Sequence, residues 1–209
     1  AVAHANGDAI GAGRRRLPVR AAVGAQLPRH VVHLRRGDAR PPDRLAGAIN
    51  RERTTDDLVK KFGYTLIHPY NDEKLIAGQG TLVLEIFHDI KDLDYLFVPI
   101  GGGGLISGCA IAAKNLFPNV KVIGVETEGA NDCFQSFRAK KIIKLQAANT
   151  IADGMRTLSV GTLNFEIIQK YVDDVITIKD EDIFPMMKFF LERMKILVEP
   201  TGAVAPAAA

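Results

Sequence analysis

The most restrictive feature of the sequence is VPIGGGGLISG at residues 98–108, where four glycines separate two apolar runs. Each glycine loses more backbone freedom on folding than any other residue, so four in succession are costly unless something must approach the backbone closely. The preceding run, DYLFVPI (94–100), is typical of a strand buried on both faces. The following run, 105–117, has a helical pattern that stops before Pro118. The glycines are therefore predicted to join the carboxyl end of a buried strand to the amino end of a helix.

A loop in this position favours an anionic ligand. The first turn of a helix offers N–H groups without partners and a partial charge of about +0.5, and glycine lets an anion approach them. Ligands of open α/β sheets bind at the carboxyl edge of the strands. A phosphate group is therefore the natural occupant, and a flexible connector is the alternative.

Two common phosphate-binding motifs do not fit this loop. Glu126 ends the next predicted strand about 20 residues later, where a dinucleotide-binding unit would carry its ribose-binding carboxylate. However, no register of the glycines gives GxGxxG, because the sixth position is Ile106 from Gly101 and Ser107 from Gly102. GxxxxGK[ST] is also absent. These observations exclude the Rossmann fingerprint and the P-loop.

The rest of the chain alternates between strand-like and helix-like segments. Strands alternating with helices imply right-handed βαβ units, so we expect an α/β fold with a parallel twisted sheet and flanking helices. The further strands are predicted at 64–70, 121–126 and 172–178, and the further helices at 54–62, 73–90, 131–141, 162–171 and 180–195.

The amino-terminal part differs in composition from the rest. Residues 1–50 contain nine arginines and three aspartates but no lysine, glutamate, serine, threonine or aromatic residue. We therefore predict two domains: residues 1–53 with little packed structure, and residues 54–209 folded. Arg14–Arg16 could contact a polyanion, but no groove-reading motif accompanies them, which argues against nucleic acid. A misread or foreign segment is a further interpretation. Since the chain begins with Ala1, we also expect it to be incomplete at its start.

Two absences restrict the environment of the protein. No apolar run approaches the roughly 20 residues that span a bilayer, so we expect no membrane segment. Cys109 and Cys133 form no CxxC pair, which favours free thiols and a cytoplasmic protein.

The glycine loop is one of four blocks that share an order and spacing with a known family. AGQGT (77–81) lies upstream, and TIADG (150–154) and EPTGA (199–203) lie downstream. Together the blocks resemble the threonine dehydratase and serine racemase family of pyridoxal-phosphate enzymes (fold type II). The resemblance implies that residues 54–209 are the carboxyl-terminal part of the cofactor domain, and hence an incomplete fold type II domain. It implies cofactor contacts from Gly101, Gly102, Gly103, Gly104, Leu105, Gly154 and Glu199.

Oxygen-bearing residues concentrate in VETEGANDCFQS (125–136), which includes Glu126, Glu128 and Asp132. Carboxylate and carbonyl oxygens suit Mg²⁺ or Ca²⁺. Alternatively, the segment is a loop that caps the following helix. The resemblance favours a divalent cation bound by Glu126, the Ala130 carbonyl and Asp132.

The same resemblance shows what this sequence does not contain. The family lysine that forms the Schiff base with the cofactor lies in an SFKxRG-like block far upstream, followed by an SSGNHAQG-like block. Neither occurs in residues 1–53, and no SGGN block follows. No catalytic residue can therefore be assigned, and we expect the chain alone to be inactive. The resemblance implies a parent threonine/serine ammonia-lyase that forms a 2-oxo acid and ammonia from a small amino acid, as a homo-oligomer. A serine racemase and a non-catalytic phosphate-ligand binding module are the alternatives.

Overall fold

The computed structural model describes the backbone of residues 48–209 and the side chains of residues 55–209. The chain divides into two compact units, residues 1–66 and 67–209. In the first unit, helix α1 (Ala48–Phe62) begins earlier than the predicted start at residue 54. It is followed by Gly63, whose φ is 68°. The predicted lack of packing in residues 1–53 otherwise lies outside the described residues.

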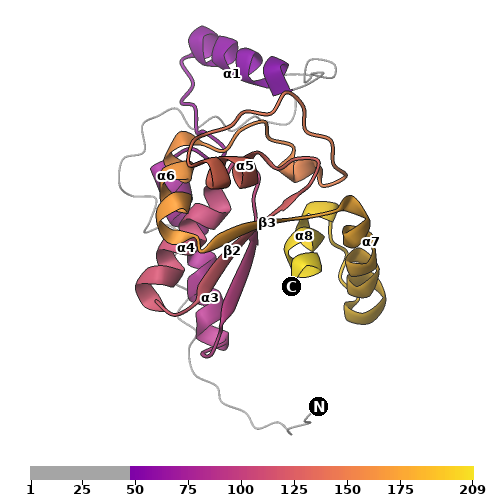
Figure 1. Cartoon of the computed structure of the whole chain (residues 1–209). Coiled ribbons are helices and arrows are strands. Elements are labelled where there is room, and N and C mark those ends of the chain that lie inside the picture. Colours follow the sequence, from indigo (N-terminus) through magenta and orange to yellow (C-terminus); the bar gives the residue numbers. More distant parts are fainter. Residues whose placement is uncertain (1–47) are drawn as a thin grey trace, which may run out of the picture. The chain divides into compact units, whose positions relative to one another are not determined.

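The second unit is built on a parallel sheet, which confirms the predicted α/β fold. Its described strands are β1 (Tyr95–Pro99), β2 (Lys121–Thr127) and β3 (Asp174–Ile178), in the order β1-β2-β3 (Figure 1). Tyr95 pairs with Lys121, and Ile123 pairs with Asp174. All three carboxyl ends therefore meet at one edge.

The predicted strand at 64–70 is wrong. The His68 ring folds back on the chain and its Nδ1 accepts the N–H groups of Tyr70 (3.3 Å) and Asn71 (2.9 Å). Pro69, which lies between His68 and Tyr70, has no N–H to donate to a strand pairing. Local side-chain bonding therefore produces a turn that leads directly into Asp72, whose carboxylate caps the next helix.

The predicted helix at 73–90 is two helices, α2 (Glu73–Gln79) and α3 (Thr81–Asp89), separated by Gly80. Gly80 lies directly against helix α4 (Gly104–Leu116), since a Cβ atom built on it would be 3.0 Å from the carbonyl oxygen of Gly108. The break between α2 and α3 therefore falls where two backbones approach each other closely.

The other predicted helices are present. The remaining elements are α5 (Asp132–Ala139), a 3₁₀ turn (Asp153–Met155), α6 (Thr162–Tyr171), α7 (Asp180–Phe189), a π-helical turn (Phe190–Met194) and α8 (Pro200–Ala208). Helix α8 contains most of the EPTGA block and was not predicted. None of the described helices combines the length and the apolar character needed to cross a bilayer.

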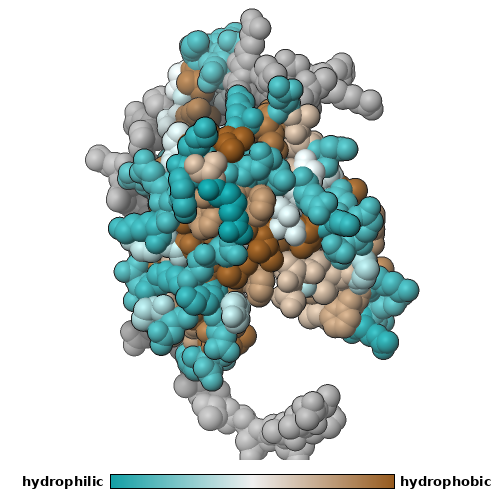
Figure 2. Space-filling model, in the orientation of Figure 1, coloured by the Kyte–Doolittle hydropathy of each residue, from teal (hydrophilic) through white to brown (hydrophobic). Residues whose placement is uncertain are grey.

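Each face of the sheet has its own apolar core. Val98 and Val122 pack on one side with residues of α3, α4 and α6, such as Ile106. Val125 and Ile178 pack on the other side with residues of α7 and α8 (Figure 1). The α7–α8 layer also carries apolar side chains on its surface, which is tan to brown in Figure 2. Exposed examples are Phe184, Phe189, Leu191 and Leu197.

Candidate functional site

The glycine loop lies at the carboxyl edge of the sheet, as the sequence predicts. The Ile100 N–H makes the last bond to the sheet, donating to the Val125 carbonyl (2.9 Å). Gly103 has a φ of 92° and is the N-cap of α4, and the Ser107 N–H donates to its carbonyl (3.0 Å). Within the described part of the chain, no N–H group of residues 101–105 donates a hydrogen bond to a protein acceptor.

These unused N–H groups suit an anion. They occupy the positive end of a helix of 13 residues, where a phosphate would receive both the helix field and direct hydrogen bonds. No side chain fits between the loop and its neighbours. A Cβ on Gly102 would overlap the Tyr70 ring, and one on Gly103 would lie 3.0 Å from Val160 Cγ2. The donor set and the bare backbone therefore fit a phosphate group.

Gly154 connects this loop to the EPTGA block. A Cβ built on Gly101 would be 3.2 Å from the Gly154 carbonyl oxygen, and the Gly154 N–H donates to Thr201 Oγ1 (3.1 Å). Glu199 is the N-cap of α8, and its side chain is exposed. The structure thus brings the loop, the TIADG block and α8 together, with Glu199 at the start of that helix.

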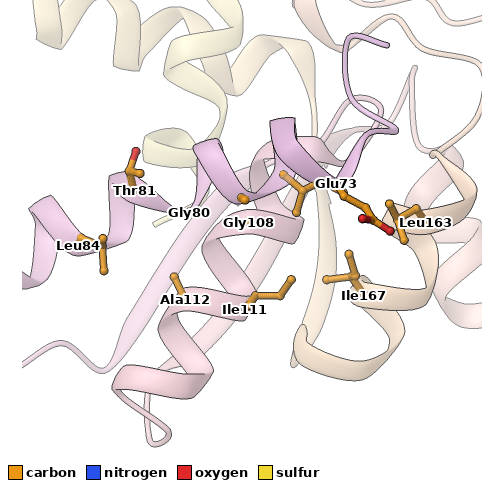
Figure 3. Close-up of a pocket in the computed structure, with 11 residues that line it drawn as sticks. Glu73, Gly80, Thr81, Leu84, Gly108, Ile111, Ala112, Leu163 and Ile167 are labelled. Carbon is orange, nitrogen blue, oxygen red and sulfur yellow. The ribbon is translucent and has the colours of Figure 1, made fainter. Parts of the chain in front are cut away.

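The AGQGT block lies elsewhere. Gly80 and Thr81 line a groove of about 330 Å³ between α2–α3, α4 and α6 (Figure 3). Its wall is largely aliphatic, with the Glu73 carboxylate near Leu163 at one end. None of residues 101–105 lines this groove, so it is separate from the glycine loop.

Glu126 is the second-last residue of β2, and its carboxylate caps α5. Its Oε1 accepts the Cys133 N–H (3.1 Å) and its Oε2 accepts the Phe134 N–H (2.6 Å). Burial, followed by the nearby charge of Asp132, raises the pKa of Glu126 well above its usual value, and the two N–H donors lower it in part. The capping role that the sequence left open is therefore present.

Asp132 lies beside this cap and is also fully buried. Neither of its carboxylate oxygens has a hydrogen-bond partner among the described residues. Burial raises the pKa of Asp132 to about 7, although the nearby Val160 amide and Thr157 hydroxyl lower it in part. Ala130, two residues before Asp132, is also buried. No group of three or more His, Cys, Asp or Glu side chains with metal-binding geometry occurs in the described part of the chain.

Comparison with known proteins identifies the family. The family model described as "Pyridoxal-phosphate dependent enzyme" matches residues 19–209. The chain belongs to this family. Serine racemase of Schizosaccharomyces pombe is 46% identical over 160 residues, which are 77% of this chain and 50% of that protein. L-threo-3-hydroxyaspartate ammonia-lyase of Saccharomyces cerevisiae is 45% identical over 77% of this chain and 49% of that protein.

A solved structure agrees with this assignment. The crystal structure of a threonine deaminase from T.th. superposes with a TM-score of 0.76 and 42% identity, covering 79% of this chain and 56% of that one. The chain spans about half the length of the curated relatives named above. The predicted family and the predicted fold are both confirmed.

Two residues that the sequence did not single out support the glycine loop of this family member. Tyr70 packs on Gly102, and Asn164 donates from α6 to the Gly102 carbonyl (2.7 Å). One feature of the sequence could have indicated Asn164. It is a polar residue four positions before Ile168, on the face of α6 that is otherwise apolar. No motif surrounds Tyr70 or Asn164.

Proposed function

We propose that residues 101–105 bind the phosphate of pyridoxal 5′-phosphate, and that the intact protein is a threonine/serine ammonia-lyase. The observation that supports the cofactor site best is the row of N–H groups without acceptors at the amino end of α4. Charge-assisted hydrogen bonds to such donors each stabilise binding by about 1.5–3 kcal/mol. Several of them offset the cost of ordering four glycines.

The neighbouring blocks complete the proposed cofactor site. Gly154 lines the ring of the cofactor, because it lies against Gly101 and a side chain there would collide with Thr201. Glu199 stands near the ring at the amino end of α8. When bound, pyridoxal phosphate supplies the electron sink that permits loss of the α-proton and the β-hydroxyl group of the amino acid.

The described residues hold the cofactor but offer no nucleophile of their own at the loop. Residues 101–105 bind through backbone N–H groups, and the Tyr70 ring fills the space beside Gly102. We therefore expect this chain alone to bind the phosphorylated ring without turning over an amino acid. In that form it would act as a phosphate-ligand binding module.

Serine racemase activity is the second candidate for the intact protein. The relatives include proteins named serine racemase at identities similar to those of the ammonia-lyases. Both activities begin with an amino acid at the same cofactor, so the residues near the loop support either. The substrate in both cases is a small hydroxy amino acid.

We further infer a divalent cation, Mg²⁺ or Ca²⁺, at Glu126, the Ala130 carbonyl and Asp132. The two unpartnered, buried oxygens of Asp132 support it, because a buried carboxylate is costly without a counter-charge. We also propose a cytoplasmic location, in keeping with the free, buried thiols of Cys109 and Cys133. The family resemblance supports a homo-oligomer, which light scattering of the intact protein would test.

The cofactor proposal is tested by comparing pyridoxine 5′-phosphate with pyridoxine. Neither compound has an aldehyde, so neither reacts with surface lysines. Calorimetry on the 209-residue chain should show much tighter binding of the phosphorylated compound than of pyridoxine, with inorganic phosphate as a competitor. Equal binding of both compounds, or no binding of either, would refute the cofactor site.

Activity requires a second experiment. With pyridoxal phosphate, the chain alone should form no 2-oxobutanoate from threonine, and borohydride should trap no adduct at one defined lysine. A chimera in which the unmatched segments of the S. pombe relative flank residues 54–209 on both sides should form 2-oxobutanoate. If the chimera only racemises serine, the second candidate replaces the first.

A further inference from the structure

A buried side-chain amide and a backbone N–H group hold one carbonyl of the glycine loop. Asn164 is fully buried on α6, and its Nδ2 donates to the carbonyl oxygens of Gly102 (2.7 Å) and Tyr70 (3.0 Å). The Gly161 N–H donates to the same Gly102 oxygen (3.0 Å). Two donors from the start of α6 thus converge on one carbonyl of the loop.

This convergence fixes the direction of a neighbouring donor. The peptide bond between Gly102 and Gly103 is planar and trans, so its C=O and N–H groups point in opposite directions. Because the Gly102 oxygen is held toward α6, the Gly103 N–H points away from α6. That N–H has no acceptor among the described residues.

We propose that Asn164 is a positioning residue that turns the Gly102–Gly103 peptide so that the Gly103 N–H donates to the ligand phosphate. This inference rests on the proposed function of the loop. Asn164 does not touch the ligand, and it acts through the carbonyl of Gly102. Without it, the Gly161 N–H alone would hold that carbonyl, and a glycine–glycine peptide is free to rotate.

The surroundings of Asn164 indicate that the fold requires its Nδ2 donor and not its Oδ1 acceptor. Its Oδ1 is buried and has no partner in the described part of the chain, which is an energetic cost that a leucine would avoid. Its Nδ2 lies between two carbonyl oxygens, so only a donor suits that position.

A second asparagine fixes the start of α6. Helix α6 has no side-chain cap of its own, and the Leu163 N–H donates instead to Asn71 Oδ1 (3.0 Å). A Cβ on Gly161 would be 2.8 Å from Asn164 Nδ2 and 2.7 Å from Asn71 Oδ1, so glycine leaves room for both amides. The turn at 68–71, α6 and the loop therefore form one connected support.

The test uses the full chain and the variants Asn164→Leu and Asn164→Asp. Asn115→Leu is the matched control, because Asn115 is exposed on α4 and bonds only within that helix. The readout is the ratio of the dissociation constants for pyridoxine and pyridoxine 5′-phosphate. We expect this ratio to fall about tenfold in both Asn164 variants, the effect of losing one charge-assisted hydrogen bond, and to stay unchanged in Asn115→Leu. A merely structural role would weaken both ligands equally.

A measurement on the unmodified chain covers the case in which the variants do not fold. On addition of inorganic phosphate, the Gly103 amide proton should shift downfield in the NMR spectrum together with other loop amides. Suppose that the unmodified chain prefers the phosphorylated ligand. If Asn164→Leu then keeps the same ratio of dissociation constants, the positioning role is refuted and the cofactor site stands. The same conclusion follows if the Gly103 amide proton alone fails to shift. If the unmodified chain shows no preference, both are refuted.

Discussion

Replacing Asp132 with asparagine should stabilise the protein at neutral and alkaline pH. Burial raises the pKa of this carboxyl from 3.8 to about 7, so the folded state keeps a proton that the unfolded state releases. The wild-type protein therefore loses stability as the pH rises from about 4 to about 7. A shift of this size corresponds to at most about 4 kcal/mol, and relaxation of the site should reduce it to about 2–4 kcal/mol. The asparagine side chain has no charge to bury, so the variant avoids this loss.

Urea unfolding followed by far-ultraviolet circular dichroism, in EDTA, measures the effect. The free energy of unfolding of Asp132→Asn should exceed that of the wild type at pH 8, and the difference should vanish toward pH 4. Asp89→Asn, a change at an exposed position, is the control. A variant that is no more stable than the wild type at pH 8 would refute the assigned cost of this buried carboxylate.

The proposed cation gives the same experiment a second arm. Millimolar Mg²⁺ or Ca²⁺ should restore the stability of the wild type at pH 8, because the ion supplies the missing counter-charge. The Asp132→Asn variant should respond much less. An equal response of both proteins would exclude Asp132 as a ligand.

Three further substitutions test the support of the loop and the sheet. Gly103→Ala should cost about 1–3 kcal/mol of stability in urea, because its φ is 92°, and should weaken binding of pyridoxine 5′-phosphate. Asn71→Ala should cost about 1 kcal/mol in thermal or urea unfolding, because it removes the cap on the Leu163 N–H. Asp173→Asn should cost about 0.5 kcal/mol at pH 7, since its ion pair with Lys114 (2.6 Å) is partly exposed. Burial alone would raise the pKa of Asp173, but hydrogen bonds from Lys114, the Val122 N–H and Lys121 lower it. The difference should therefore disappear as the pH falls through the pKa of this carboxyl.

The strands of the sheet could be predicted because their signal is local. DYLFVPI is apolar throughout, and in the structure Val98 and Phe97 pack into the cores on opposite faces of the sheet. The segment at 64–70 has a similar apolar content but forms no strand. The His68 side chain accepts two backbone N–H groups there, and Ile67 remains largely exposed. Composition alone does not reveal whether a neighbouring strand is present to accept the backbone bonds.

The break at Gly80 shows a second limit of prediction from sequence. A single glycine within a helical pattern lowers helix stability by only about 1 kcal/mol relative to alanine. The sequence of residues 73–90 therefore predicts one helix. The structure separates α2 from α3 there because Gly108 of α4 lies directly against Gly80. The cause is a residue in a different helix, and no pattern within 73–90 encodes it.

Some features of the candidate site depend on neighbouring residues in the sequence, and others depend on distant ones. The glycine loop is a contiguous motif, so its position, its helix and its N–H donors could all be predicted from residues 98–108. The direction of those donors depends on Asn164 and Gly161, which lie far along the chain and belong to no recognisable block. If the proposed role of Asn164 holds, a sequence that keeps all four glycines would still bind phosphate more weakly once the amide that contacts the Gly102 carbonyl is replaced. The proposed cofactor site therefore depends on Asn164 as well as on the four glycines.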